Sequence, residues 1–362
     1  MSGNGISGVR RSPRPARQLD SGSPELLADP FQEHAAPLMR GPLQLLGARF
    51  RFESNSEELL AIVDSAYAGL PGHTLSDSAP ELCVRLLVSD RGRTHRVGSE
   101  PPPLEMFSGG SLLGGATASS DFVVISPHEG TALMRVSPRM LAYPYHTRYE
   151  LIEFAVFTLA ARCQGLVPLH SACMGLGGRG VLLMGPSGAG KSTVALQCLL
   201  QGFDFISEDS AFVTPDTLLA TGVANFLHVR ADSMRFVAHA SEVEAIRSSP
   251  LIRRRSGVRK LEVDLRCGSY RLAAEPLRIA AIVFASPQLA TGPLLAPLEG
   301  PAIATRLAAE QAYAASQPQW SLFCQSVRGI KGFELRRGRH PMEAVEALRT
   351  LLGAWDIRQG EP

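Results

Sequence analysis

The sequence has almost no net charge, no long apolar run and no closely spaced pair of cysteines. A formal charge of +2 gives no overall attraction to nucleic acid, so this class of partner is not expected. No apolar stretch reaches the roughly 18 residues needed to span a bilayer. The arginines near the N-terminus are not followed by the apolar segment of a secretory signal. We therefore expect a cytoplasmic protein that binds neither nucleic acid nor a membrane.

The cysteines exclude two further classes of protein. None of them forms a C-x-x-C motif, so their spacing is typical of neither a zinc site nor a disulfide framework. Several lie inside apolar runs, which predicts buried free thiols in a reducing compartment. The six residues are Cys83, Cys163, Cys173, Cys198, Cys267 and Cys324.

What the sequence does contain is the pattern Gly185-x-x-x-x-Gly190-Lys191-Ser192. Residues 181–184, just before it, are apolar and predict a buried strand, and residues 193–201 have the pattern of a helix. Between a strand and a helix, such a loop points its backbone N–H groups at an anion from the positive end of the helix. The sequence therefore predicts a phosphate-binding loop.

The loop residues have expected roles in holding ATP with Mg²⁺. Lys191 can reach the β- and γ-phosphates, and the Ser192 hydroxyl can bind the metal. Only three lysines occur in this arginine-rich chain, which supports a specific role for Lys191, although a genome-wide preference for arginine would give much of the same imbalance. The loop residues expected to bind the nucleotide are Gly185, Pro186, Ser187, Gly188, Ala189, Gly190, Lys191, Ser192 and Thr193.

Composition and periodicity divide the chain into three parts. Residues 1–40 are rich in Gly, Ser, Pro and Arg and predict a disordered tail. Residues 41–145 predict a small α+β domain, in which order begins at Leu43 and a helix follows the capping residues 54–58. Residues 146–362 alternate strand and helix patterns and predict an α/β domain that contains the loop.

Two acidic residues end the strand that follows the loop helix. They are Glu208 and Asp209, and Asp209 comes 18 residues after Lys191. In common nucleoside triphosphatases the acid that supports Mg²⁺ lies on a strand much later in the chain, whereas here both acids can face one metal–phosphate centre. His170 lies 21 residues before Lys191, at the end of an apolar strand that could run beside the loop strand.

This arrangement resembles the HPr kinase/phosphorylase superfamily, and specifically its HPr-kinase-related branch. The resemblance is carried by residues 168–170, by the loop, by Gly202 and by residues 206–209, and extends more weakly to Lys260 and residues 276–283. It implies a P-loop kinase core similar to those of HPr kinase and phosphoenolpyruvate carboxykinase, which binds ATP and phosphorylates a protein serine. Members of the branch also occur beside peptide natural-product genes, including lasso peptide clusters, where they phosphorylate a precursor peptide.

The sequence departs from the family pattern in three respects. Thr193 stands where the family usually has Glu after the loop serine, and Glu208 stands where it usually has Asp. The family's later acidic signature, which supplies another metal ligand, has no clear counterpart between Pro215 and Asp232. The resemblance therefore implies phosphoryl transfer for this chain, and it does not extend to dephosphorylation or to recognition of HPr.

Phosphoryl transfer requires positioning and charge neutralisation, which gives the candidate residues their roles. We expect Ser192 and Glu208 to hold Mg²⁺, and Asp209 to take the proton of the acceptor hydroxyl, with His170 and Lys191 as the other catalytic residues. The alternatives are that Asp209 only supports the metal ligands, that Glu208 is solvated, and that His170 is a core histidine with satisfied hydrogen bonds.

A cationic run, Arg253-Arg-Arg255 with Arg259 and Lys260, precedes a predicted strand. Such a run is usually a solvated loop. The alternative is a mobile loop that closes over the phosphates or grips an acidic peptide, because arginine forks suit phosphate. Arg259 and Lys260 are the residues of this run that we predict to contact the nucleotide.

The sequence thus predicts an ATP- and Mg²⁺-dependent serine kinase that acts on a peptide or small protein. One alternative is a small-molecule kinase or carboxykinase-like enzyme on the same core. Another is a nucleotide-binding regulator without catalysis, which the joint presence of Lys191, Ser192 and Asp209 disfavours. Whether the chain forms a homo-oligomer is left open.

Overall fold

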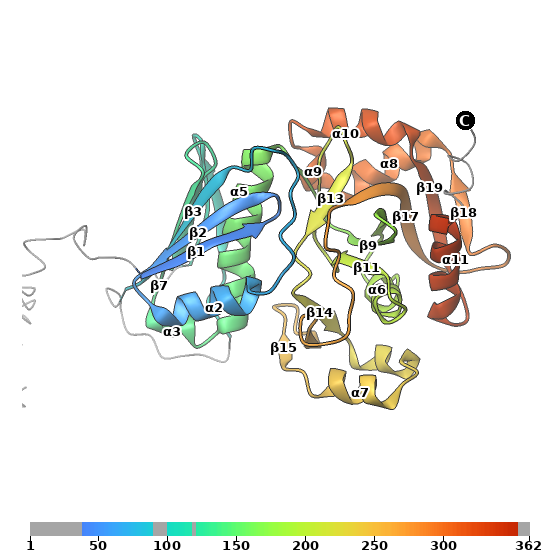
Figure 1. Cartoon of the computed structure of the whole chain (residues 1–362), viewed down its shortest axis with the longest axis horizontal. Helices are drawn as coiled ribbons and strands as arrows, with labels where there is room; N and C mark the ends of the chain where they lie inside the picture. Colours follow the sequence, from blue (N-terminus) through green and yellow to red (C-terminus); the bar gives the residue numbers. More distant parts are fainter. Residues whose placement is uncertain (1–37, 90–99, 118–120, 354–362) are drawn as a thin grey trace, which may run out of the picture. The chain divides into compact units, whose positions relative to one another are not determined.

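Residues 38–89, 100–117 and 121–353 are described by a computed structural model, and Figure 1 shows their helices and strands. The predicted disordered tail falls on residues 1–37, outside the described residues, and on residues 38–40, which belong to the first strand. The described residues all belong to one unit that begins at Leu38. All six cysteines are free thiols, as predicted, but only Cys173 and Cys198 are buried, and Cys267 is exposed, because it lies in the loop after β16 rather than in an apolar run.

The N-terminal half of this unit contains a seven-stranded mixed sheet. One of its strands shows the period of two that a half-buried strand requires, since Phe50 and Phe52 are buried while Arg49 and Arg51 between and beside them are exposed. In spatial order the strands are β1 (Leu38–Leu45), β2 (Ala48–Ser54), β3 (Glu81–Val88), β7 (Thr131–Val136), β6 (Phe122–Ser126), β5 (Leu112–Ala116) and β4 (Glu105–Gly109).

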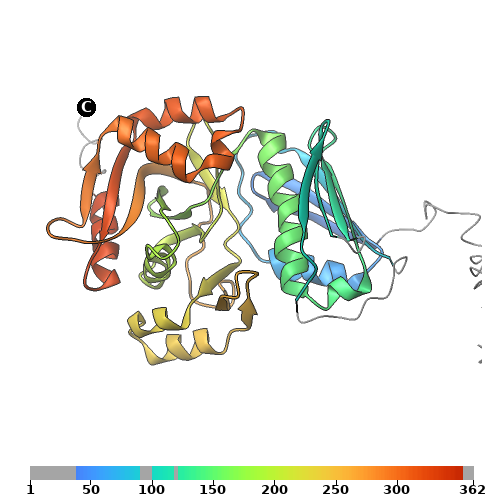
Figure 2. The ribbon, with the colours of Figure 1, turned by 180° about the vertical axis from the view of Figure 1, so that it is seen from behind.

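Helices pack against this sheet. Helix α2 (Glu57–Tyr67) begins where the capping residues predicted, because the Ser56 side chain accepts a hydrogen bond from the Leu59 N–H at 3.3 Å. Helix α5 (Glu153–Gln164) runs along the sheet in both ribbon views (Figure 1, Figure 2). The elements that lead into α5 are α3 (Pro138–Leu141), α4 (Pro144–His146) and the π-helix η1 (Thr147–Ile152).

The C-terminal half contains a nine-stranded mixed sheet that holds the phosphate-loop strand near its centre. This strand, β10 (Arg179–Met184), pairs in parallel with the long strand β17 (Leu277–Leu289) and antiparallel with β9 (Ala172–Leu176). The path of the sheet is β11 (Asp204–Ser207), β9 (Ala172–Leu176), β10 (Arg179–Met184), β17 (Leu277–Leu289), β13 (Leu219–Gly222), β12 (Ala211–Val213) and β8 (Val167–Leu169), and off this path β19 (Lys331–Arg337) pairs with β17 and β18 (Leu295–Leu298).

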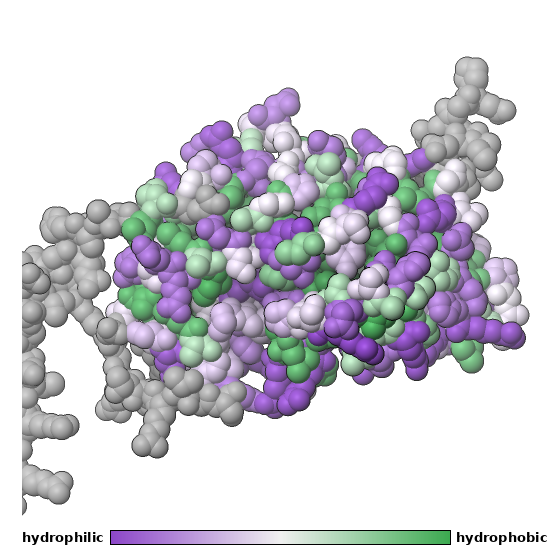
Figure 3. Space-filling model, turned by 60° about the horizontal axis from the view of Figure 1, so that its bottom comes forward, coloured by the Kyte–Doolittle hydropathy of each residue, from purple (hydrophilic) through white to green (hydrophobic). Residues whose placement is uncertain are grey.

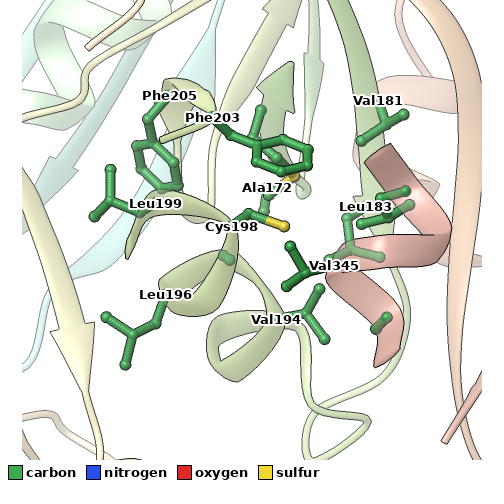
Figure 4. Packing of buried hydrophobic residues seen from close by; sticks show 14 of the residues in the cluster. Ala172, Val181, Leu183, Val194, Leu196, Cys198, Leu199, Phe203, Phe205 and Val345 are labelled. Carbon is green, nitrogen blue, oxygen red and sulfur yellow. The ribbon is translucent and has the colours of Figure 1, made fainter. Parts of the chain in front are cut away.

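Both faces of this sheet are buried, because side chains of β10 alternate between two cores. Val181 and Leu183 pack with the helices α6 (Lys191–Leu200) and α11 (Pro341–Gly353), as Figure 4 shows. Leu182 lies in the other core, on the opposite face of the sheet. The helices of that opposite face are α8 (Gly300–Glu310), α9 (Ala312–Ala315) and α10 (Trp320–Ser326), followed by η3 (Val327–Gly329).

The C-terminal half also contains a smaller three-stranded sheet, which contacts the helix that follows the phosphate loop. Its strands are β14 (Phe226–Val229), β16 (Arg259–Asp264) and β15 (Leu251–Arg253). Between β14 and β15 the chain forms η2 (Ala231–Phe236) and α7 (Ala240–Arg247). This sheet carries the charged residues that surround the acids at the end of β11.

The α/β fold class predicted from the sequence is confirmed. The predicted boundary at residue 145 separates the seven-stranded sheet from the nine-stranded one, but the division into domains stays a prediction, since the described residues form one unit. The strands β4 and β5 lie within residues 99–120, a segment rich in Pro, Gly and Ser that has no strand pattern. None of the helices in the described ranges is long and apolar enough to cross a membrane. On the face drawn in Figure 3, apolar residues are scattered among polar ones.

Candidate active site

The phosphate loop lies between β10 and α6, as the sequence predicted. Gly185 approaches β17 so closely that a Cβ atom would lie 2.6 Å from the carbonyl oxygen of Ala285, which only glycine avoids. Gly190 caps α6 in the left-handed region, with φ of 97°. Among the backbone hydrogen bonds of the described residues, the N–H groups of Ser187, Gly188 and Gly190 donate none. These free donors at the start of α6 suit an anion.

The Lys191 side chain folds back over this loop. Its Nζ donates to the carbonyl oxygen of Gly185 and, at 3.3 Å, to that of Pro186. Burial lowers the pKa of Lys191, while the negative charges of Asp209, Glu310 and Glu208 act in the opposite direction. An ammonium group that has only carbonyl partners in a half-buried place fits the phosphates of a nucleotide.

His170 and Asp209 meet at the mouth of the loop. The Nδ1 atom of His170 lies 2.7 Å from Oδ1 of Asp209, and Nη2 of Arg254 lies 3.6 Å from Oδ2 of the same carboxylate. The hydrogen bond to Asp209 raises the pKa of His170. Burial by itself would raise the pKa of Asp209, but the bond to His170 and the nearby positive charges outweigh it and lower this pKa to about 2. Asp209 is therefore ionised at neutral pH.

The backbone of His170 is held from both sides by one buried side chain. His170 lies between β8 and β9, and Gln311 lies between α8 and α9. The Gln311 Oε1 accepts a hydrogen bond from the His170 N–H at 2.8 Å, and its Nε2 donates to the His170 carbonyl oxygen at 3.1 Å. The strand that ends at His170 is β8, which pairs with β12, so the prediction that it runs beside the phosphate-loop strand is wrong. The strand that does so is β9, which follows His170 and runs antiparallel to β10.

Glu208 points away from solvent into a buried charge cluster. Its Oε2 accepts hydrogen bonds from the His228 backbone N–H at 2.8 Å and from His228 Nδ1 at 3.1 Å, and Lys260 Nζ lies 3.9 Å from its Oε1. Burial favours a raised pKa for Glu208, but the contacts with His228 and the charge of Lys260 lower it. The alternative of a solvated Glu208 does not describe this geometry.

The cluster continues from His228 into the N-terminal half. His228 Nε2 lies 3.2 Å from Oε1 of Glu262, so both ring nitrogens face carboxylates, and although burial lowers the pKa of His228, the two carboxylates raise it overall. Glu262 also accepts hydrogen bonds from Arg148, which lies in the π-helix η1 and is 3.5 Å from Glu153. A continuous row of buried charges thus joins the site to the start of α5.

The arginine run forms the turn between β15 and β16, and its three members point in different directions. Arg253 pairs with Glu100 at 3.0 Å, and Arg255 forms a two-point ion pair with Glu150 at 2.6 and 2.5 Å. Arg254, between them, points at Asp209. The run is therefore anchored at both sides and presents Arg254 to the site.

These residues surround a pocket of about 410 Å³, a size that suits a small-molecule ligand. Eight lysines and arginines line it against three carboxylates, so it favours a polyanion. The pocket is lined by most of the predicted site residues, which are Pro186 to Thr193, His170, Glu208, Asp209 and Lys260. Gly185 does not line it and instead packs closely against Ala285 of β17.

Arg259 does not line the pocket; it lies exposed on β16. Sequence reasoning had favoured Arg259 and Lys260 as nucleotide contacts, whereas the structure presents Arg254 and Lys260 to the pocket. Nothing in the run of five cations could have distinguished Arg254 from Arg259. Sequence reasoning also missed three residues, because the folded chain brings each of them to the site from a distant part of the sequence. They are His228, Gln311 and Glu262. No group of three His, Cys, Asp or Glu side chains in the described ranges is arranged to hold a metal ion. Mg²⁺ bound with nucleotide phosphates needs only one or two protein ligands, which Ser192 and a nearby carboxylate can provide.

The loop, its strand and its helix define a phosphate-loop protein of the α/β class. No family model matches the chain. Among curated proteins, the chain is similar to an HPr kinase/phosphorylase of Lachnoclostridium phytofermentans, with 24% identity over 242 residues, 65% of this chain and 69% of that protein. A search of solved structures finds an HPr(Ser) kinase/phosphatase of Coxiella burnetii, at 13% identity and a TM-score of 0.24, covering 54% of this chain and 99% of the other. The sequence similarity supports the predicted relation to the HPr kinase superfamily.

Proposed function

We propose that this protein is an ATP- and Mg²⁺-dependent kinase that phosphorylates a serine of a peptide or small protein. The observation that carries the proposal is the ionised carboxylate of Asp209, which faces the phosphate loop with His170 at 2.7 Å and Arg254 at 3.6 Å. A carboxylate beside bound phosphates repels them, so its presence there points to a use: it can hold a metal ion or accept a hydrogen bond from a hydroxyl that approaches the phosphates. We assign Asp209 the second of these roles. The relation to HPr kinase/phosphorylase, which by name acts on a protein, supports the same activity.

The loop residues hold the nucleotide in this proposal. Ser192, in the first turn of α6, holds Mg²⁺ together with the phosphates, and the ion neutralises charge on them when it is bound. Glu208 lines the same pocket, but its two oxygens contact His228 and Lys260. Its role as a metal ligand therefore requires the 3.9 Å contact with Lys260 to give way.

Asp209 accepts a hydrogen bond from the acceptor hydroxyl and orients it toward the terminal phosphorus. As the new oxygen–phosphorus bond forms, the bond to the bridging oxygen of ADP breaks, and the hydroxyl proton passes to Asp209. Lys191, His170 and Arg254 bring positive charge to the phosphoryl group as it moves. A low pKa makes Asp209 a weak base, which suits a loose transition state in which the proton leaves late.

The test uses three acceptors in parallel: peptides with a C-terminal serine, peptides with an internal serine, and HPr. Each is incubated with the full chain, ATP and Mg²⁺, and intact-mass measurement detects one added phosphoryl group. We expect modification of at least one acceptor, and none with Asp209→Asn over the same time. Nucleotide binding by calorimetry without transfer to any of these three acceptors would contradict the proposal and favour a regulator or a small-molecule kinase.

A further inference from the structure

The residues that line the pocket form two groups of different chemistry. The first group is Asp209, His170 and Arg254, whose charged groups surround the place of transfer. The second group comes from η2 and the turn between β19 and α11, which supply an aromatic ring, a histidine and arginines. Phosphoryl transfer uses the first group only, so the second group needs an explanation of its own.

The direction of the bound phosphates relates the two groups. In a phosphate loop the lysine reaches the β- and γ-phosphates, while the backbone holds the α- and β-phosphates. Since the γ-phosphate must face Asp209, we expect the nucleoside to point away from Asp209. At the start of α6, Thr193 Oγ1 lies 3.1 Å from Ser233 Oγ, which ties this helix to η2. Phe236 comes three residues after Ser233 and ends η2.

Phe236 is placed as a stacking surface. Its ring meets that of His340 edge-on, with centroids 5.3 Å apart and an interplanar angle of 84°. The guanidinium group of Arg235 lies over the same ring, 4.7 Å from its centroid. Phe236 is half-buried, lines the pocket and belongs to none of the hydrophobic clusters of the described residues. Packing in a core therefore does not account for it.

We propose that Phe236, with Arg235 and His340 beside it, binds the base of the nucleotide by stacking. A planar base stacks on an aromatic ring or on a guanidinium plane, and either surface of this pair offers such a place. Stacking tolerates any base because every base has a π-face, and purines offer the larger one. We therefore expect ATP and GTP to bind with similar affinity, and CTP more weakly. The inference rests on the proposed function, since it takes the loop as a nucleotide site.

Calorimetry with two Mg²⁺-loaded ligands separates the base from the phosphates. One ligand is ATP, and the other is inorganic tripolyphosphate, which lacks the nucleoside. In Phe236→Ala we expect affinity for ATP to fall roughly 5- to 150-fold, the range that corresponds to the loss of one base–aromatic stack. Affinity for tripolyphosphate should stay within about twofold of the unchanged protein by the same principle.

A second variant and a matched control guard against misfolding. Phe236→Trp should keep ATP affinity, and its fluorescence should change with ATP and not with tripolyphosphate, because only the base contacts the indole. Phe107→Ala removes an exposed aromatic ring on β4, away from the pocket, and should bind both ligands normally. Weakening of both ligands to the same extent by Phe236→Ala would overturn the base site.

The failure of the two proposals can be told apart. If the unchanged protein binds tripolyphosphate as tightly as ATP, the base contributes nothing and the base site is refuted, while the phosphate site stands. If the unchanged protein binds neither ligand, the nucleotide site itself is refuted, and the base site with it.

Discussion

We predict that Arg148→Met strongly destabilises the fold, because Arg148 belongs to the row of buried charges that joins the site to the start of α5. The side chain of Arg148 is 6% exposed, and it lies between the carboxylates of Glu153 and Glu262, which are 9% and 10% exposed. Its guanidinium group also covers the ring of Phe226 at 4.1 Å. Methionine keeps much of the apolar contact and removes the charge, so Glu153 loses its arginine and Glu262 keeps only its contact with His228.

Breaking a buried ion pair by removing one partner costs about 3–5 kcal/mol. Burial already raises the pKa of Glu153 against the opposing charge of Arg148, so loss of that charge should raise it further. At about 2 °C per kcal/mol for a large domain, the melting temperature should fall by roughly 6–10 °C. Thermal unfolding followed by circular dichroism measures this fall.

An exposed arginine in an ion pair provides the matched control. Arg49 pairs with Glu81 at the surface, with side chains 55% and 70% exposed, so Arg49→Met should cost at most about 1 kcal/mol. Adding Glu153→Gln and Glu262→Gln to Arg148→Met should recover much of the loss, because no buried charge is then left alone. A melting temperature for Arg148→Met equal to that of Arg49→Met would refute the reasoning.

Three further predictions concern the pocket. Lys191→Ala should weaken Mg²⁺·ATP binding roughly 10- to 100-fold in calorimetry, as the loss of one charge-assisted contact implies. Lys191→Arg should not restore the binding, because the planar guanidinium fork differs from an ammonium group. Unchanged affinity in Lys191→Ala would contradict the phosphate-loop assignment. Arg254→Ala should lower the transfer rate at saturating substrates while Arg259→Ala leaves it unchanged, and the reverse result would return the site role to Arg259. In an NMR titration His170 should lose its proton above the ordinary pKa of about 6.5, and below it in Asp209→Asn. Because the folded pKa is raised, this pair stabilises the fold fully below the ordinary pKa and loses that contribution as pH rises through the raised value, so chemical unfolding should show the decline in the unchanged protein and not in His170→Gln.

The elements with a local signal were predictable from the sequence. The phosphate loop, its strand and the helix after it follow from glycines and periodicity within a short segment, and the structure confirms them. Helix α2 was predicted from its cap at Ser56. The hairpin of β4 and β5 was not, because Gly114 and Gly115 lie in a segment whose Pro, Gly and Ser content indicates a loop.

Contacts between distant parts of the chain could not be predicted from the sequence. Gln311 holds His170 across 141 residues, and no motif marks a glutamine for that position. Arg254 contacts Asp209 across 45 residues from the turn after β15, and no local pattern distinguishes it from its neighbours in the arginine run. Phe236 carried no signal either, since a lone aromatic residue is usually part of a core.

The central claim is that Asp209 serves the acceptor hydroxyl in phosphoryl transfer. The most direct measurement compares Asp209→Asn with the unchanged protein at saturating ATP and Mg²⁺, with the phosphorylated acceptor quantified by mass spectrometry and ATP affinity by calorimetry. Asparagine keeps the shape of the side chain and cannot take a proton, so the rate should fall roughly 100-fold or more while ATP affinity stays near normal. Glu208→Gln should instead shift the Mg²⁺ titration more than the rate at saturating metal. Transfer at the unchanged rate in Asp209→Asn would contradict the account, and an exchange of the two results would reverse the roles of the acids.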